Sequence, residues 1–238
     1  MFSFRNDPDV DGVGIAFFDA VSADGGRLDL TLGSPDRWRG AGWEQAEAEL
    51  GVPVLNAYQV HSARVLLVDA ASDPRDVAVE QADALVTTAR GLAVAVRAAD
   101  CLPVLFVDQA NSVVAAAHAG RVGLAAGVLA ETVAAIRALG GDGLRAWVGP
   151  HICGACYEVP AQLRDQISER LPAAWAQTSW GTPSLDLGAA AEAQLVELGC
   201  EVVLADPCTR TTPSLHSYRR DGASSGRQAG VVWLPTRS

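Results

Sequence analysis

The chain has 238 residues, a mass of 24.8 kDa and 49% hydrophobic residues, so it is long enough to bury a sizeable core. Its formal net charge of -10 argues against a general nucleic-acid surface, which needs clustered basic residues to neutralise phosphates. The N-terminus lacks a basic segment followed by an apolar one, and no apolar run is long enough to span a bilayer. We therefore expect a soluble cytoplasmic protein that acts on a small molecule, with no nucleic-acid or membrane partner.

Five cysteines are present, an odd number that does not resemble the disulfide framework of a small secreted domain. We expect free thiols, one of them as a metal ligand. No internal repeat, low-complexity tract or linker interrupts the sequence, so residues 1–238 are expected to form a single domain.

The first hundred residues predict short strands and one helix. A hairpin is expected over residues 10–32, where apolar runs alternate with turn residues, and a helix over residues 34–50, which Gly51 ends. An acidic loop is expected at residues 72–76. Further strands are expected at residues 54–61, 63–69, 83–87 and 91–96.

A second hairpin is expected from residues 102–108 and 112–118, which flank a turn. If Asp108 pairs with Val113, Pro103 lies opposite His118, and Cys101 lies at the same end of the hairpin, about one diagonal step away. A slip of one residue would turn His118 to the other face.

An amphipathic helix is expected over residues 123–139, directly after this hairpin. Its N-terminus would point backbone N–H groups at Cys101 and His118 and attract an anion; the alternative is only a tight turn before a helix. A strand at residues 144–148 follows, and then a C-x-x-C formed by Cys153 and Cys156, which suits a redox dithiol or half of a zinc site. No second C-x-x-C exists to complete a site with four thiolates.

The last third predicts helices at residues 161–171 and 186–198, a strand after the core residue Cys200, and a final strand. The tail also concentrates arginines in an otherwise acidic chain. Positive charge beside glycines suits a phosphate or a carboxylate, although a solvated turn has the same composition. The arginines are Arg210, Arg219, Arg220 and Arg227.

His61, Cys101 and His118 together offer two imidazoles and one thiolate, a set that suits zinc with a fourth position open. Zinc there would lower the pKa of a bound water or polarise a substrate oxygen. Copper accepts the same ligands, but the only methionine is Met1 and four histidines are too few for several copper ions. A cysteine hydrolase is a third possibility, with Cys101 as nucleophile, His118 as base and Asp100 or another acid orienting the imidazole.

Six ordered motifs carry a resemblance to a known family over about residues 28–234. The motifs are Gln59-Val60-His61, Asp83 to Thr87, Ala99 to Val104, Ala117 to Gly120, Gly149-Pro150 with Cys156 to Val159, and Ser217 to Gly222. The chain resembles the laccase-domain family, also called polyphenol oxidase-like or purine nucleoside phosphorylase-like.

The resemblance implies that His61, Cys101 and His118 are catalytic zinc ligands, and that the fold is a layered α/β/β/α sandwich with mixed sheets. It also implies action on purine nucleosides, namely phosphorolysis of adenosine, inosine, guanosine or methylthioadenosine and deamination of adenosine. Some members of the family are described instead as peptidoglycan editing factors, cytoplasmic enzymes that remove misincorporated L-serine from cell-wall precursors. The older oxidase name implies a copper-dependent polyphenol oxidase.

Two departures from the family pattern affect the predicted substrate site. The family commonly shows His-Ala-Gly-Trp-Arg-Gly where this chain has Arg121 and Val122 after His118-Ala-Gly, and the family's Asn-Arg pair falls on Gly42-Trp43, one turn after Arg39. We expect a zinc-dependent cytoplasmic enzyme that uses phosphate or water at purine nucleosides, with Arg219 and Arg220 binding anionic groups.

Overall fold

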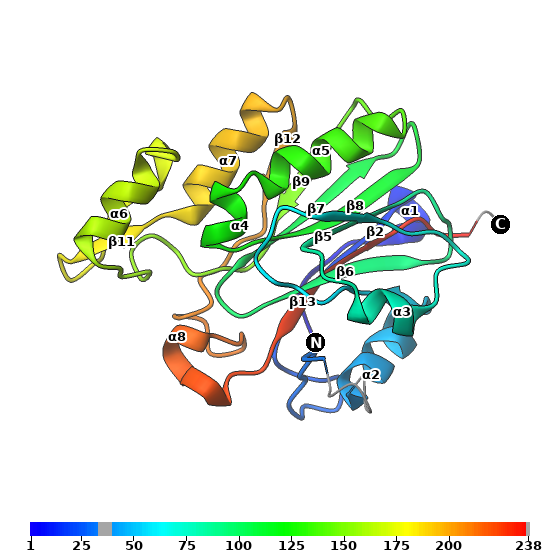
Figure 1. Ribbon diagram of the computed structural model, residues 1–238. Coiled ribbons are helices and arrows are strands. Elements are labelled where there is room, and N and C mark those ends of the chain that lie inside the picture. Colours follow the sequence, from blue (N-terminus) through cyan, green and yellow to red (C-terminus); the bar gives the residue numbers. More distant parts are fainter. Residues whose placement is uncertain (33–39, 237–238) are drawn as a thin grey trace.

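Two stacked β-sheets lie between two layers of helices in the computed structural model, which describes residues 1–32 and 40–236 (Figure 1). The five-stranded sheet contains, in spatial order, β1 (Phe2–Arg5), β2 (Gly14–Phe18), β13 (Gln228–Trp233), β6 (Ala93–Ala98) and β3 (Val54–Leu55). The six-stranded sheet contains β12 (Glu201–Leu204), β9 (Arg145–Val148), β7 (Leu102–Asp108), β8 (Val113–Ala119), β5 (Ala84–Thr87) and β4 (Val65–Leu67). Each sheet has parallel and antiparallel pairs, so the predicted α/β/β/α sandwich with mixed sheets is confirmed.

Helices cover the outer face of each sheet (Figure 1). The helices are α1 (Pro8–Asp11), α2 (Ala41–Leu50), α3 (Pro74–Val79), α4 (Arg121–Ala125), α5 (Val128–Ala138), α6 (Ala161–Ser168), α7 (Leu187–Glu197) and α8 (Tyr218–Asp221). A small hairpin, β10 (Trp175–Gln177) with β11 (Pro183–Leu185), lies between α6 and α7 in the chain.

Three apolar cores hold the four layers together. Consecutive residues of a strand point to opposite faces, so Leu105 packs between the two sheets while its neighbour Phe106 packs under α5 and α7. In the other sheet Phe17 enters the core between the sheets, and Phe18 packs with Trp43 of α2. Each of these side chains is fully buried, and burial of one such side chain stabilises the fold by roughly 1.5–3 kcal/mol.

The hairpin of β7 and β8 has the predicted register. Asp108 pairs with Val113, and Pro103 pairs with His118. The strand residues are buried on both faces because α5 covers one side and the five-stranded sheet covers the other.

The predicted helix at residues 123–139 is wrong in detail. The chain forms α4 and α5 instead, separated at Gly127, whose φ of 92° lies in the left-handed region that interrupts a helix. The predicted apolar face is nevertheless buried: Leu124, Val128, Leu129, Val133 and Ile136.

The predicted hairpin at residues 10–32 is also wrong in its second half. The strand β2 pairs with β1 and β13. Across the predicted turn the pairing is limited to one antiparallel bridge, Val21 with Arg27. Leu28 and Leu30 are buried against α2, and their N–H groups bond to the carbonyls of Ala20 and Arg227, so the bridge does not extend into a second strand. The predicted acidic loop at residues 72–76 contains the start of α3, because the Asp73 side chain caps it and Pro74 opens it.

The later elements agree with the sequence. The helices α6 and α7, the strands β9 and β12, and the final strand β13 lie where they were expected, and Cys200 is buried. Of the helix predicted over residues 34–50, α2 is present and ends at Gly51 with a φ of 73°, while residues 33–39 lie outside the described part of the chain.

Candidate metal centre and pocket

The structure brings His61, Cys101 and His118 together. Their donor atoms all lie within 4.8 Å of one another, and the Cys101 Sγ lies 3.8 Å from Nε2 of His61. The two imidazole rings lie 4.8 Å apart, centre to centre, at 72°. His118 belongs to the end of β8, Cys101 immediately precedes β7, and His61 belongs to the link between β3 and β4.

Asp83 holds the turn that carries His61. The carboxylate accepts hydrogen bonds from the N–H groups of Val60, His61 and Ser62, at 3.1, 3.0 and 2.6 Å, and from the hydroxyl of Ser62 at 2.8 Å. These bonds fix His61 at a φ of 61°, a left-handed conformation that costs a residue other than glycine about 1–2 kcal/mol. In the sequence Asp83 is only the first residue of a motif, and its role becomes visible through these tertiary contacts.

Asp83 also orients His118. Nδ1 of His118 lies 2.9 Å from Oδ1 of Asp83, and because an ionised carboxylate only accepts, Nδ1 carries the proton and Nε2 keeps its lone pair for a metal. Burial alone would raise the pKa of Asp83, but hydrogen bonds from His118 and Ser62 hold it well below its usual range. Burial lowers the pKa of His118, which favours the neutral imidazole that a metal needs.

Asp100 positions the backbone before Cys101 and does not orient an imidazole. Its φ is 88°, and its carboxylate accepts from the hydroxyl of Thr209 and the N–H of Arg219, each at 2.7 Å. The acid that orients His118 is Asp83. Burial raises the pKa of the Cys101 thiol to about 12, and the charge of Asp100 adds to this effect.

The donor set fits a metal ion, and Gly120 leaves space for it. A Cβ on Gly120 would lie 2.7 Å from Cδ2 of His61 and 3.0 Å from Sγ of Cys101, so a larger residue would displace the ligands. Two imidazoles and one thiolate suit zinc or copper. The helix that follows, α4, has five residues, so few peptide dipoles align and the expected anion site at its N-terminus is not supported.

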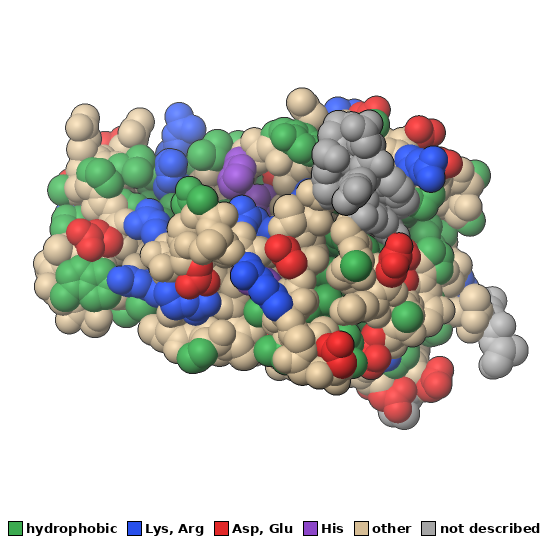
Figure 2. Space-filling model, turned by 90° about the horizontal axis from the view of Figure 1, so that it is seen from below, with side chains coloured by type: hydrophobic (Ala, Val, Ile, Leu, Met, Phe, Trp, Pro, Cys, Tyr) green, Lys and Arg blue, Asp and Glu red, His purple; other side chains and the backbone are tan. Residues whose placement is uncertain are grey.

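A pocket of about 890 Å³ opens over the cluster. All three cluster residues line it, and arginine side chains surround the histidines on the same face of the molecule (Figure 2). The arginines that line the pocket are Arg97, Arg121, Arg219 and Arg227. The pocket therefore combines metal ligands with positive charge in an acidic protein.

Arg97 is a partly buried cation of this pocket. It interrupts the apolar strand β6, donates one hydrogen bond to the carbonyl of Ala57 at 3.0 Å, and has a buried Nε with no partner among the described residues. Burial lowers its pKa to about 10, and the charge of Arg227 adds to this effect. Two like charges beside an unpartnered N–H group favour a bound anion. In the sequence Arg97 directly follows the strand predicted at residues 91–96, and this position was the available signal.

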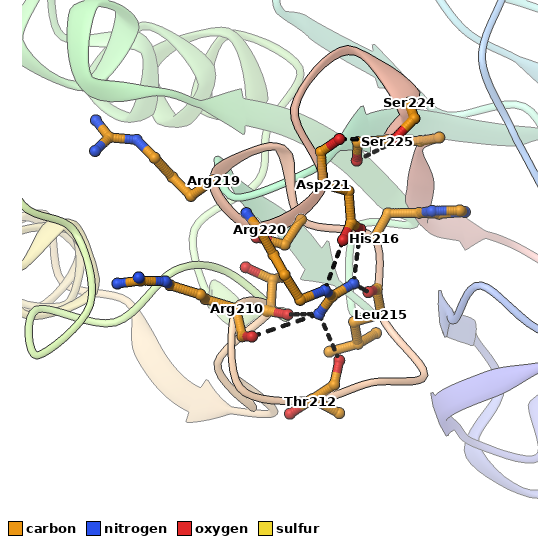
Figure 3. A network of polar contacts seen from close by, with 12 residues as sticks. Arg210, Thr212, Leu215, His216, Arg219, Arg220, Asp221, Ser224 and Ser225 are labelled. Carbon is orange, nitrogen blue, oxygen red and sulfur yellow. Dashed lines mark hydrogen bonds and ion pairs between the residues drawn. The ribbon is translucent and has the colours of Figure 1, made fainter.

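Arg219 and Arg220, the predicted substrate ligands, differ in their surroundings. Arg219 lines the pocket, stacks on Tyr157 at 4.7 Å, and donates to the carbonyl of Glu158 at 2.7 Å. The guanidinium of Arg220 pairs with Asp221 and donates to four backbone carbonyls (Figure 3). Arg220 is absent from the pocket lining and holds the tail in place. The geometry favours Arg97 and Arg227 over Arg220 as anion ligands.

The departures from the family pattern lie in different places. Arg121 begins α4 and lines the pocket. Trp43 is buried under the five-stranded sheet, and a Cβ on Gly42 would lie 2.3 Å from the carbonyl oxygen of Asp29. Arg39 lies outside the described residues.

A four-layer sandwich with a cluster of two histidines and one cysteine beneath an arginine-lined pocket defines a metal-associated, laccase-like class of protein. The chain belongs to this family: residues 40–235 match the family described as multi-copper polyphenol oxidoreductase laccase. Its relatives include a purine nucleoside phosphorylase of Streptomyces coelicolor, 49% identical over 80% of both chains. The purine nucleoside phosphorylase YfiH of Escherichia coli is 39% identical over 74% of this chain and 72% of its own.

Solved structures share the fold. A Neisseria meningitidis protein of the DUF152 family has a TM-score of 0.79 and 31% identity, covering 98% of both chains. YlmD of Geobacillus stearothermophilus has a TM-score of 0.81 over 97% of this chain and 94% of its own, at 24% identity. Within the described residues, no helix has the length and apolar character needed to cross a membrane.

Proposed function

We propose that this chain is a zinc-dependent, cytoplasmic purine nucleoside phosphorylase that also deaminates adenosine. The observation that carries the proposal is one pocket containing both the cluster of His61, Cys101 and His118 and a partly buried arginine, Arg97, whose buried Nε has no partner among the described residues. The names of the relatives support the reaction class. Adenosine, inosine, guanosine and methylthioadenosine are the proposed substrates.

His61, Cys101 and His118 would hold the zinc in this proposal. When bound, zinc supplies Lewis-acid polarisation of an oxygen of phosphate or water. Asp83 keeps His118 in the required tautomer, and the turn that it holds keeps His61 in place.

Arg97 and Arg227 are proposed to bind the phosphate. In phosphorolysis a phosphate oxygen forms a bond to the anomeric carbon of the ribose while the carbon–nitrogen bond to the purine breaks, and the purine leaves with a proton. Guanidinium groups suit the phosphate oxygens, and Arg97 is preorganised by its bond to Ala57. In deamination water replaces the amino group of adenosine and ammonia leaves, so phosphate is not required.

The replacement Arg97→Gln separates the two reactions. It is expected to raise the KM for phosphate about 10- to 100-fold, because a hydrogen bond to a charged group contributes about 1.5–3 kcal/mol, and to change the deamination of adenosine much less. Arg145→Gln is the control, because Arg145 pairs with Glu201 in an exposed position outside the pocket.

The proposal fails if zinc-loaded protein turns over neither adenosine nor inosine with phosphate, or if His118→Ala leaves the activity unchanged. Copper-loaded protein assayed beside zinc-loaded protein tests the metal. Release of serine from a nucleotide-linked cell-wall precursor, without nucleoside turnover, would indicate peptidoglycan editing instead.

A further inference from the structure

Three cysteines far apart in the sequence meet outside the pocket. Cys153 and Cys156 form the C-x-x-C after β9, and Cys208 follows β12. Their sulfur atoms all lie within 4.8 Å of one another. Cys156 is buried, whereas Cys153 and Cys208 are partly exposed. Cys208 supplies the third thiol that the sequence pattern lacked.

The local backbone presents these thiols as a set. The N–H groups of Cys156 and Tyr157 bond to the carbonyl of Cys153 at 2.9 and 3.0 Å, which closes a tight turn and brings the two thiols of the C-x-x-C together. The N–H of Cys153 points at Sγ of Cys208, 3.5 Å away. An N–H group directed at sulfur stabilises a thiolate ligand.

The spacing suits a metal ion. Zinc binds thiolates at about 2.3 Å, so sulfurs on a tetrahedral zinc lie roughly 3.8 Å apart, which small side-chain rotations reach from the present positions. A disulfide would use two of the three thiols and leave the third without a role. Three thiolates on a divalent ion leave one negative charge, and Arg210 lies beside them, donating to the carbonyl of Cys156 at 3.2 Å.

The cluster lies at a junction that supports the first site. A β-bridge joins His151 to Cys208, and the N–H of Thr209 bonds to the carbonyl of His151 at 2.9 Å. Both segments then reach Asp100: the N–H of Ile152 bonds to its carbonyl, and the hydroxyl of Thr209 bonds to its carboxylate. Asp100 precedes Cys101, so this junction positions a ligand of the first cluster.

We propose that Cys153, Cys156 and Cys208 form a second metal site that binds zinc and joins the loop after β9 to the segment after β12. A water molecule completes the coordination on the exposed side. The site is structural, because its sulfurs are absent from the lining of the pocket. Its loss loosens the support of Asp100.

The test is zinc stoichiometry in protein purified and reconstituted under reducing conditions. We expect two zinc ions per chain, one in Cys208→Ser, one in His118→Ala and none in the double variant. Cys200→Ser is the matched control, because Cys200 is a buried thiol outside the cluster, and it should retain two ions. Loss of the ion from Cys208→Ser with retention in the control supports the site.

Cys208→Ser could lose its zinc because it misfolds, so a second measurement keeps all three cysteines in place. In His118→Ala, cobalt at the remaining site should give the intense thiolate-to-metal absorption of a site with three thiolates. The proposal is overturned if the wild-type chain holds one zinc that Cys208→Ser does not lower, or if the cobalt spectrum of His118→Ala shows no thiolate band. A disulfide among the three cysteines in zinc-loaded protein would also overturn it.

Discussion

Asp83→Asn tests whether one buried carboxylate organises the metal centre. Five donors converge on the two oxygens of Asp83: three backbone N–H groups, the hydroxyl of Ser62 and Nδ1 of His118. Asparagine keeps one accepting oxygen and puts an NH₂ group where the other accepted. If that NH₂ faces His118, the imidazole must accept at Nδ1 and carry its proton on Nε2, which removes the lone pair that binds a metal.

The expected cost has two parts. A hydrogen bond to a charged group contributes about 1.5–3 kcal/mol to the free energy of unfolding, so Asp83→Asn should lower it by at least that amount. Asp83 has no exposed surface, so water cannot replace the lost bond. Loss of an outer hydrogen bond to a ligating histidine typically weakens metal binding about 10- to 100-fold. The tautomer change and the loosened turn at His61 both act on the ligands, so the weakening should lie at the upper end of that range.

Competition with a chromophoric chelator measures the zinc affinity, and urea unfolding measures the stability. Asp108→Asn is the matched control: Asp108 is equally buried and accepts hydrogen bonds from Asn111 and from the N–H of Asp142. It lies at the opposite end of the β7–β8 hairpin from His118. Both variants should lose stability, and only Asp83→Asn should lose zinc affinity. Wild-type zinc affinity in a folded Asp83→Asn protein would refute the reasoning.

Three further predictions concern the cluster, the tail and pH. Gly120→Ala should weaken zinc binding at least about tenfold, because its Cβ would lie 2.7 Å from Cδ2 of His61; unchanged affinity in the same chelator competition would contradict this. Arg220→Met should lower the free energy of unfolding by about 2–4 kcal/mol and leave the KM for phosphate unchanged, whereas a tenfold change in KM would assign Arg220 to the substrate. Burial lowers the pKa of both His118 and His216 below 6.5, so in the metal-free protein the unfolded chain binds protons more readily than the folded one. The free energy of unfolding should therefore be highest above pH 6.5 and should fall as the pH falls below it, by up to about 1.4 kcal/mol per pH unit for each histidine. Urea unfolding at a series of pH values measures this change. A flat profile from about pH 7.5 to about pH 5.5 would contradict that assignment.

Local patterns predicted the elements wherever one periodicity dominated. The hairpin of β7 and β8 has the predicted register because the short turn brings Asp108 opposite Val113, which fixes the pairs that follow. The N-terminal hairpin is reduced to one bridge, Val21 with Arg27, because the apolar residues Leu28 and Leu30 pack into the core without extending the pairing. An alternation of apolar and polar residues indicates which side chains are buried, but it does not indicate which backbone segments pair in a sheet.

The sequence predicted the metal ligands, but it did not predict the residues that position them or that complete the pocket. His61, Cys101 and His118 are chemically distinctive, and their motifs match a family, but Asp83 and Arg97 acquire roles only through tertiary contacts. The same holds for the three-cysteine cluster, since its third thiol comes from a segment 55 residues beyond Cys153. That the ligands are catalytic and that residues 1–238 act as one domain stay predictions.

The position of the pocket follows from the way the chain changes sheets. The link from β3 to β4 carries His61, and the link from β6 to β7 carries Asp100 and Cys101; each link leaves the five-stranded sheet and enters the six-stranded one. Backbone that crosses between sheets leaves both ladders, so its N–H and C=O groups need other partners. Side chains such as Asp83 and backbone groups such as the N–H of Ile152 supply them, and the two crossings keep left-handed residues that an unsupported loop would not retain. The ligands are therefore held in place because the rest of the fold supplies hydrogen-bond partners to the backbone of the two links that carry them. The metal centre lies at the end of the sandwich where both links meet the end of β8.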